Sequence, residues 1–113
     1  MIEFLAFLFV KHYVVDFIMQ TDDMVKGKGI YGNRDGIIHS LRHALGTFAI
    51  AVLLIENPFY WFILPVMDFV FHYHIDYIKI KYGCRDITNP KFWNHLGLDQ
   101  LAHYLTYLLL VTI

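Results

Sequence analysis

Polar side chains recur at every fourth position within four long apolar segments of the chain. A spacing of four places side chains on one face of an α-helix. The four segments are residues 2–20, 35–55, 59–81 and 95–113, and their polar positions are His12, Asp16, Gln20, Asp35, His39, His43, Asp68, His72, Asp76, Asp99 and His103. The pattern predicts four helices, each with one narrow polar stripe on an otherwise apolar surface.

The segments between these helices differ in length and character. Residues 21–36 and 82–94 are rich in glycine, asparagine and charge, which is typical of solvated loops. Asp35 is expected to cap the N-terminus of the second helix. The turn Glu56-Asn57-Pro58 is short, so the helices on either side of it should be antiparallel neighbours.

The first half of the chain resembles the second at an offset of 60 residues, so residues 2–55 and 59–113 are interpreted as two repeats. The matching polar positions are His12 with His72, Asp16 with Asp76, His39 with Asp99 and His43 with His103. Because each repeat contains two helices, both copies should have the same orientation, related by a pseudo-two-fold axis along the membrane normal.

Composition changes the interpretation from a soluble helical bundle to a membrane protein. The chain has 113 residues, enough for one domain, with 58% hydrophobic and 18% aromatic residues, which is more apolar than a soluble domain of this size. We therefore expect an all-α, polytopic protein with four transmembrane helices in two hairpins. Basic residues lie mainly near the two loops. This distribution predicts cytoplasmic loops, outward-facing termini and insertion in the inner membrane, and does not suggest nucleic-acid binding.

The paired His and Asp residues predict a metal site, because side chains at i and i+4 present two donor atoms to one point. The expected ligands are Asp16, His39, His43, His72, Asp76, Asp99 and His103. Imidazole and carboxylate ligands suit Zn²⁺, with Mn or Fe as alternatives. The single cysteine, Cys84, does not provide the thiolate pairs of a structural zinc site.

Other polar residues on or near the stripes receive supporting roles. His12 is expected to act as a ligand or as a catalytic base, and Lys79 to neutralise an anionic substrate. Gln20, Asp68 and Gln100 are expected to orient imidazole groups or bound water.

Metal binding is one of three explanations for the buried charge. An unpaired Asp in hydrocarbon costs about 2.5–3.5 kcal/mol on insertion scales, so each carboxylate needs a compensating partner. Hydrogen bonds between His and Asp across helices, or a pathway for protons or ions, would also provide one.

Two phrases carry a resemblance to a known family: Asp16-Phe17-x-x-Gln20-Thr21 and Asp99-Gln100-x-x-His103. They resemble the small integral membrane proteins of bacteria and phages grouped as domain of unknown function 3307, over nearly the whole chain. This resemblance implies a helical membrane fold but no reaction. A looser similarity, through histidines near the start of a membrane helix, is to membrane proteins classed as metal-dependent hydrolases.

Two functional hypotheses follow. The first is a membrane-bound metal-dependent hydrolase whose cytoplasm-facing site cleaves an ester or phosphoester, such as that of a lipid. The alternative is a non-enzymatic membrane module: a proton or ion pathway, or a phage-type protein that acts on a host membrane partner. Self-association is left open, and Ala44, Gly46 and Ala102 offer small surfaces for it.

Overall fold

The computed structural model describes residues 2–113 and confirms an all-α fold. Its elements are α1 (Ile2–Tyr13), the π-helix η1 (Val14–Ile18), α2 (Asp22–Lys28), α3 (Arg34–Leu54), α4 (Pro58–Tyr82) and α5 (Pro90–Thr112). The expectation of four helices was wrong in number, because the first loop contains the additional helix α2.

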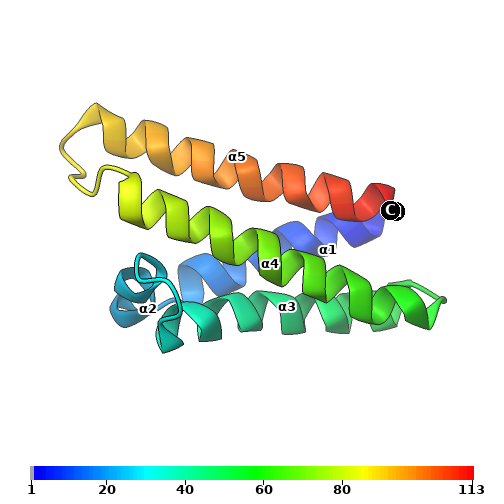
Figure 1. The fold of residues 1–113 in the computed structure, drawn as a ribbon. Coiled ribbons are helices and arrows are strands. Elements are labelled where there is room, and N and C mark those ends of the chain that lie inside the picture. Colours follow the sequence, from blue (N-terminus) through cyan, green and yellow to red (C-terminus); the bar gives the residue numbers. More distant parts are fainter. Residues whose placement is uncertain (1) are drawn as a thin grey trace.

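The four long elements form an antiparallel bundle. α1 and α4 run in one direction and α3 and α5 in the other, and the start of α1 and the end of α5 lie at the same end of the bundle (Figure 1). α2 lies at the opposite end, where it packs against α3 and α4. We call this opposite end the loop end.

The first predicted helix, residues 2–20, is not regular throughout. It changes from α1 to the π-helix η1 at Val14, and the backbone N–H of Met19 donates to the oxygen of Val14 at 2.9 Å. A π-helix closes its turns over five residues, so it is wider than an α-helix and is often found at functional sites. Asp16 lies within this widened turn.

The segment predicted as a solvated loop, residues 21–36, contains the helix α2 instead. Thr21 caps this helix, its hydroxyl oxygen accepting from the N–H of Met24 at 3.2 Å. Acidic residues occupy the first turn, where they interact favourably with the helix dipole.

α2 touches the beginning of α3 through two glycines. A Cβ atom added at Gly36 would lie 3.0 Å from the backbone oxygen of Gly27, which is closer than a larger side chain tolerates. The contact therefore favours glycine, and it holds the end of α2, with Lys28, against the beginning of α3.

Three asparagines cap the long helices. Asn33, Asn57 and Asn89 each accept a hydrogen bond from the backbone N–H two residues later, at 2.9–3.0 Å. The predicted cap Asp35 was therefore wrong, because it supplies the N–H that Asn33 accepts. α5 also begins at Pro90, five residues before the predicted start at residue 95.

The distribution of polarity in the bundle is inverted relative to a soluble protein. Among residues 2–113, fourteen buried side chains are polar or charged and eleven are hydrophobic, whereas 33 large hydrophobic side chains are exposed. The hydrophobic core consists of Phe4, Leu8, Ala51, Leu64, Tyr107 and Leu110. The interior of the bundle therefore contains more polar than hydrophobic side chains, including those of Asp16, Asp76 and Asp99.

One helix, α3, is long and apolar enough by itself to cross a membrane. α4 has 25 residues and α5 has 23, but they carry buried charged residues such as Asp68, Asp76 and Asp99. Four crossings remain a prediction.

Candidate metal centre

Eight His and Asp side chains come together inside the bundle, and we call them the His/Asp cluster. They are His12, Asp16, His39, His43, His72, Asp76, Asp99 and His103, and all are buried. The structure groups them into three overlapping sets, within each of which the donor atoms lie within 4.8 Å of one another. The cluster contains every residue that the sequence predicted as a metal ligand, together with the predicted base His12.

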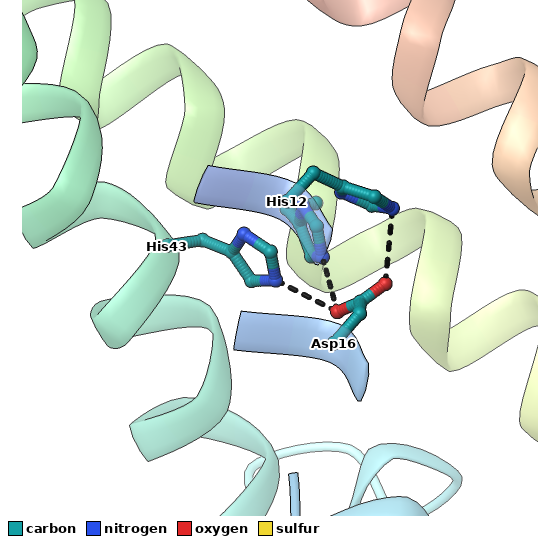
Figure 2. Close-up of side chains that lie close together, drawn as sticks. His12, Asp16 and His43 are labelled. Carbon is teal, nitrogen blue, oxygen red and sulfur yellow. Dashed lines mark hydrogen bonds and ion pairs between the residues drawn. The ribbon is translucent and has the colours of Figure 1, made fainter. Parts of the chain in front are cut away.

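The first half of the cluster is built around the carboxylate of Asp16. Its Oδ1 lies 2.9 Å from Nε2 of His39 and 2.8 Å from Nε2 of His43, and its Oδ2 lies 3.1 Å from Nε2 of His12. The side chains of His12 and His43 approach the same carboxylate from different helices (Figure 2). Three imidazoles from α1 and α3 therefore converge on one acid in η1.

The second half is built around the carboxylate of Asp76. Its Oδ1 lies 2.9 Å from Nε2 of His103, which in turn lies 3.3 Å from Oδ1 of Asp99. Asp76 and His103 are 27 residues apart in the chain, as are Asp16 and His43. The second half thus repeats the first contact, but it has a carboxylate where the first half has His39.

His72 connects the two halves. Its Nε2 lies 3.7 Å from Asp16 Oδ1 and 3.5 Å from Asp76 Oδ2. Its ring stacks on those of His43 and His103, with centroids 3.6 and 3.9 Å apart. His39 also bridges the halves, because its Nε2 lies 3.6 Å from Asp76 Oδ2. The halves therefore share two imidazoles and form a single centre.

Several donor atoms in the cluster have no hydrogen-bond partner among the described residues. They include His72 Nε2 and Asp99 Oδ1. Leaving a buried polar atom without a partner costs about 1–3 kcal/mol. A divalent cation would satisfy these atoms, and the mixture of imidazole and carboxylate suits Zn²⁺, Mn²⁺ or Fe²⁺.

Sequence reasoning missed Lys28. Its ammonium nitrogen lies 3.2 Å from Asp76 Oδ2, and both side chains are buried. The glycines around Lys28 had favoured a solvated loop. The cap Thr21 followed by two acidic residues is a helix-start signal that could have revealed α2.

A second buried contact lies beside the cluster and was also missed. Lys11 pairs with Asp68 at 2.8 Å, and the hydroxyl of Thr47 donates to the same carboxylate oxygen. Asp68 was expected to orient an imidazole, and its Oδ1 lies 3.9 Å from Nδ1 of His72. Its shorter contacts are with Lys11 and Thr47.

The two glutamines have different positions. Gln100 presents Oε1 2.8 Å from Nε2 of His12, while Nδ1 of His12 lies 2.8 Å from the hydroxyl of Tyr107. Both ring nitrogens of His12 therefore have a polar partner, and the direction of each hydrogen bond depends on the tautomer of the imidazole. Gln20 instead donates to the backbone oxygen of Asp16 at 2.9 Å.

Lys79 lies outside the cluster, half-buried between two cavities at the loop end. The first, of about 370 Å³, lies between α4 and α5 and reaches Asp99 of the cluster. The second, of about 380 Å³, is lined by four basic residues: Lys26, Lys28, Lys79 and Arg85. The predicted role of Lys79 toward an anionic substrate stays a prediction.

The loop between α4 and α5 is held by local hydrogen bonds. His95 accepts from the backbone N–H of Cys84 at 2.8 Å, so it links this loop to α5. Asp86 accepts from both the hydroxyl and the N–H of Thr88, and these bonds hold the pKa of Asp86 below its usual range.

The sequence profile of one family, described as "Protein of unknown function (DUF3307)", matches residues 4–113. The chain belongs to the DUF3307 family. The expected resemblance is thereby confirmed. No curated protein and no solved structure is significantly similar to this DUF3307 chain.

The two phrases that suggested DUF3307 have clear structural roles. Asp16 lies in the cluster, Gln20 donates to its backbone oxygen, and Thr21 caps α2. In the second phrase Asp99 and His103 lie in the cluster, with Gln100 bound to His12. Both phrases therefore mark the buried centre of this DUF3307 protein.

Proposed function

We propose that the chain is an integral membrane protein that binds a divalent metal ion in the His/Asp cluster and hydrolyses a phosphoester or ester. Zn²⁺ is the expected ion, with Mn²⁺ and Fe²⁺ as alternatives. The observation that carries the proposal is the convergence of eight buried His and Asp side chains in a bundle with an apolar exterior.

The exposed surface supports insertion into a bilayer. Soluble monomers rarely expose large contiguous apolar patches, whereas 33 large hydrophobic side chains are exposed among residues 2–113. Charged residues within membrane helices usually face the interior of the bundle and have a function. The basic loops would lie in the cytoplasm, and the N- and C-termini would lie outside.

The cluster offers the groups that metal-dependent hydrolysis needs. A bound divalent ion supplies Lewis acidity to a water molecule and to the scissile ester. His12, held between Gln100 and Tyr107, is positioned to hold or transfer a proton. Asp16 would supply a carboxylate oxygen and His43 an imidazole nitrogen as ligands of the ion.

The cavities at the loop end favour a phosphoester of a lipid as the substrate. Besides Lys28, whose ammonium pairs with Asp76, the basic cavity is lined by Lys26, Lys79 and Arg85 and by the single acidic residue Asp22. The excess of basic side chains suits an anionic group such as a phosphate. The neighbouring cavity between α4 and α5 has mainly apolar walls, which include Ile75, Ile78, Leu98 and Ala102. Such walls suit an acyl chain, and Lys79 borders both cavities.

Elemental analysis combined with a hydrolysis assay tests this proposal. The protein purified in detergent is expected to contain a stoichiometric transition metal and to cleave a phospholipid in mixed micelles. Asp16→Asn should lose both properties, while Asp23→Asn, at an exposed position of α2, should keep them. A purified protein that contains no metal and gains none on reconstitution contradicts the proposal.

A second candidate function, conduction of protons or ions, is favoured by a different observation. Gln100, His12 and Tyr107 form a chain of hydrogen bonds, and the ammonium of Lys11 lies 4.8 Å from the Tyr107 ring centre. Lys11 continues the polar path to Asp68. A pH-dependent flux in liposomes that Asp76→Asn abolishes would support conduction, whereas a silent flux assay with an intact metal centre counts against it.

Homo-oligomerisation remains a proposal. Two of the three small residues suggested for self-association pack against other parts of the same chain. Ala44 is buried, and a Cβ added at Gly46 would lie 2.6 Å from the side chain of Lys11. Ala102 is half-buried beside the cavity between α4 and α5.

A further inference from the structure

We propose that Lys28 takes the place of a second metal ion, so that this two-part centre holds one divalent ion, in the half built around Asp16. The inference rests on the proposed metal-dependent function and specifies how its centre is loaded. It assigns to Lys28 the role of a permanent cation within the His/Asp cluster.

The two halves are similar enough that each could hold an ion. Asp16 and His43 meet at 2.8 Å, and Asp76 and His103 meet at 2.9 Å, with the same chain separation of 27 residues. His72 lies between the two carboxylates. A symmetric arrangement of this kind would be expected to bind two ions, one in each half.

The halves differ in the cations that reach them. Lys28 lies 3.2 Å from Asp76 Oδ2, and the two side chains are 8% and 3% exposed. The lysine nearest to Asp16 in the sequence, Lys11, pairs with Asp68 instead. Among residues 2–113, only the second half therefore has an ammonium group at a carboxylate oxygen where a metal ion would bind.

The balance of charge agrees with a single ion. With neutral imidazoles, the cluster and its lysine contain three carboxylates, those of Asp16, Asp76 and Asp99, and one ammonium group. One divalent ion would make this buried group neutral. A second would leave two uncompensated positive charges in a bundle with an apolar exterior, where unpaired charge is costly.

The donor sets also favour the first half for the ion. His39 and His43 flank Asp16, and a centre of imidazoles with one carboxylate is typical of Zn²⁺ sites. The donor atoms of His12, Asp16, His43 and His72 form one such set, whereas the set of Asp76, Asp99 and His103 has two carboxylates and one imidazole. A carboxylate-rich site attracts any cation, including an ammonium group held nearby.

The fold holds Lys28 in this position. It is the last residue of α2, and the backbone of α2 is fixed against α3 by the close approach of Gly27 and Gly36. The ammonium group is therefore delivered by a short helix and does not depend on a flexible loop.

Metal stoichiometry provides a direct test. Metal-free protein in detergent would be titrated with Zn²⁺, and the ions retained per chain counted by calorimetry and elemental analysis. We expect one ion for the wild type and two for Lys28→Met, in which the ammonium group is replaced by a neutral side chain of similar length. Lys26→Met, at an exposed position of the same helix, should bind one.

Each alternative count contradicts a specific claim. Two ions in the wild type, or one ion in Lys28→Met, overturns the inference while leaving the metal centre in place. No bound ion in the wild type overturns the proposed function itself, and with it this inference. Circular dichroism would establish that each variant keeps its helical content.

A second pair of variants tests the inference if Lys28→Met does not fold. Asp99→Asn removes the charge of a carboxylate in the half that holds no ion, so this variant should still bind one Zn²⁺ per chain. Asp16→Asn should bind none. Loss of the ion from Asp99→Asn, or its retention in Asp16→Asn, would overturn the assignment of the ion to the first half.

Discussion

The ammonium nitrogen of Lys11 lies 2.8 Å from the carboxylate of Asp68, and these side chains are 6% and 0% exposed. The pair joins α1 to α4, and Thr47 of α3 donates its hydroxyl to the same carboxylate oxygen. One buried ion pair thus connects three helices beside the His/Asp cluster.

Breaking this pair on one side should destabilise the fold strongly. Lys11→Met and Asp68→Asn are each expected to lower the free energy of unfolding by about 3–5 kcal/mol, because each leaves a buried group without its partner. The double variant Lys11→Met/Asp68→Leu should recover most of that loss. Unfolding in mixed micelles would measure it, with exposed Lys26→Met as control, and single variants as stable as the wild type would contradict the role of the pair.

Gln100 should influence metal affinity more than Gln20 does. Gln100 contacts His12 and Asp99, and loss of a group that orients metal ligands typically lowers metal affinity about 10–100-fold. Gln100→Ala should show a decrease of this size in calorimetric titration. Gln20→Ala is the matched control, since Gln20 contacts the backbone of Asp16, and equal losses in both variants would refute the distinction.

Two glycines should respond to the same substitution in opposite directions. In Gly36→Ala the new Cβ would lie 3.0 Å from the backbone oxygen of Gly27, and overpacking of this kind typically costs about 1–3 kcal/mol. A Cβ at Gly97, in α5, meets nothing within 4 Å, so Gly97→Ala should stabilise the helix by about 0.8–1 kcal/mol. Thermal unfolding of both variants would show whether their midpoints move apart.

Labelling with a membrane-impermeant thiol reagent should locate the two ends of the bundle. In a Cys84→Ser background, Lys91→Cys is expected to react in inverted membrane vesicles and not in intact spheroplasts, because the basic loops should be cytoplasmic. Glu56→Cys, in the turn at the opposite end, should show the reverse. Both positions are exposed, so labelling of both from one side would contradict the proposed crossings.

Metal binding should increase the stability of the protein. A ligand at about 100 times its dissociation constant raises the free energy of unfolding by about 2.7 kcal/mol when it binds only the folded state. Zn²⁺ should therefore raise the unfolding midpoint of metal-free protein, and a chelator should reverse the change. Asp16→Asn is expected not to respond, and an equal response from this variant would place the ion elsewhere.

The residues of the cluster were predictable because their chemistry is local in the sequence. His72 and Asp76 lie four residues apart, so any helix through this segment places them on one face. Spacing within one helix does not indicate which stripes meet, and the contacts of Asp16 with His43 and of Asp76 with His103 come from the structure.

The missed features depend on contacts between distant parts of the chain. Nothing close to Lys11 in the sequence identifies Asp68 as its partner, 57 residues away. The π-helix around Asp16 has no recognisable sequence signal. Lys28 follows glycines that favour a loop, and its burial depends on the packing of α2 against α3 and α4.

The short helix α2 has no counterpart in the second hairpin, where residues 83–89 form an irregular connection. The two connections therefore border the centre differently, with α2 packed against α3 and α4 on one flank and the cavity between α4 and α5 on the other. The cavity on the second flank is lined by Lys79 and by Asp99 of the cluster. The difference between the two connections therefore leaves the two flanks of the centre with different surroundings.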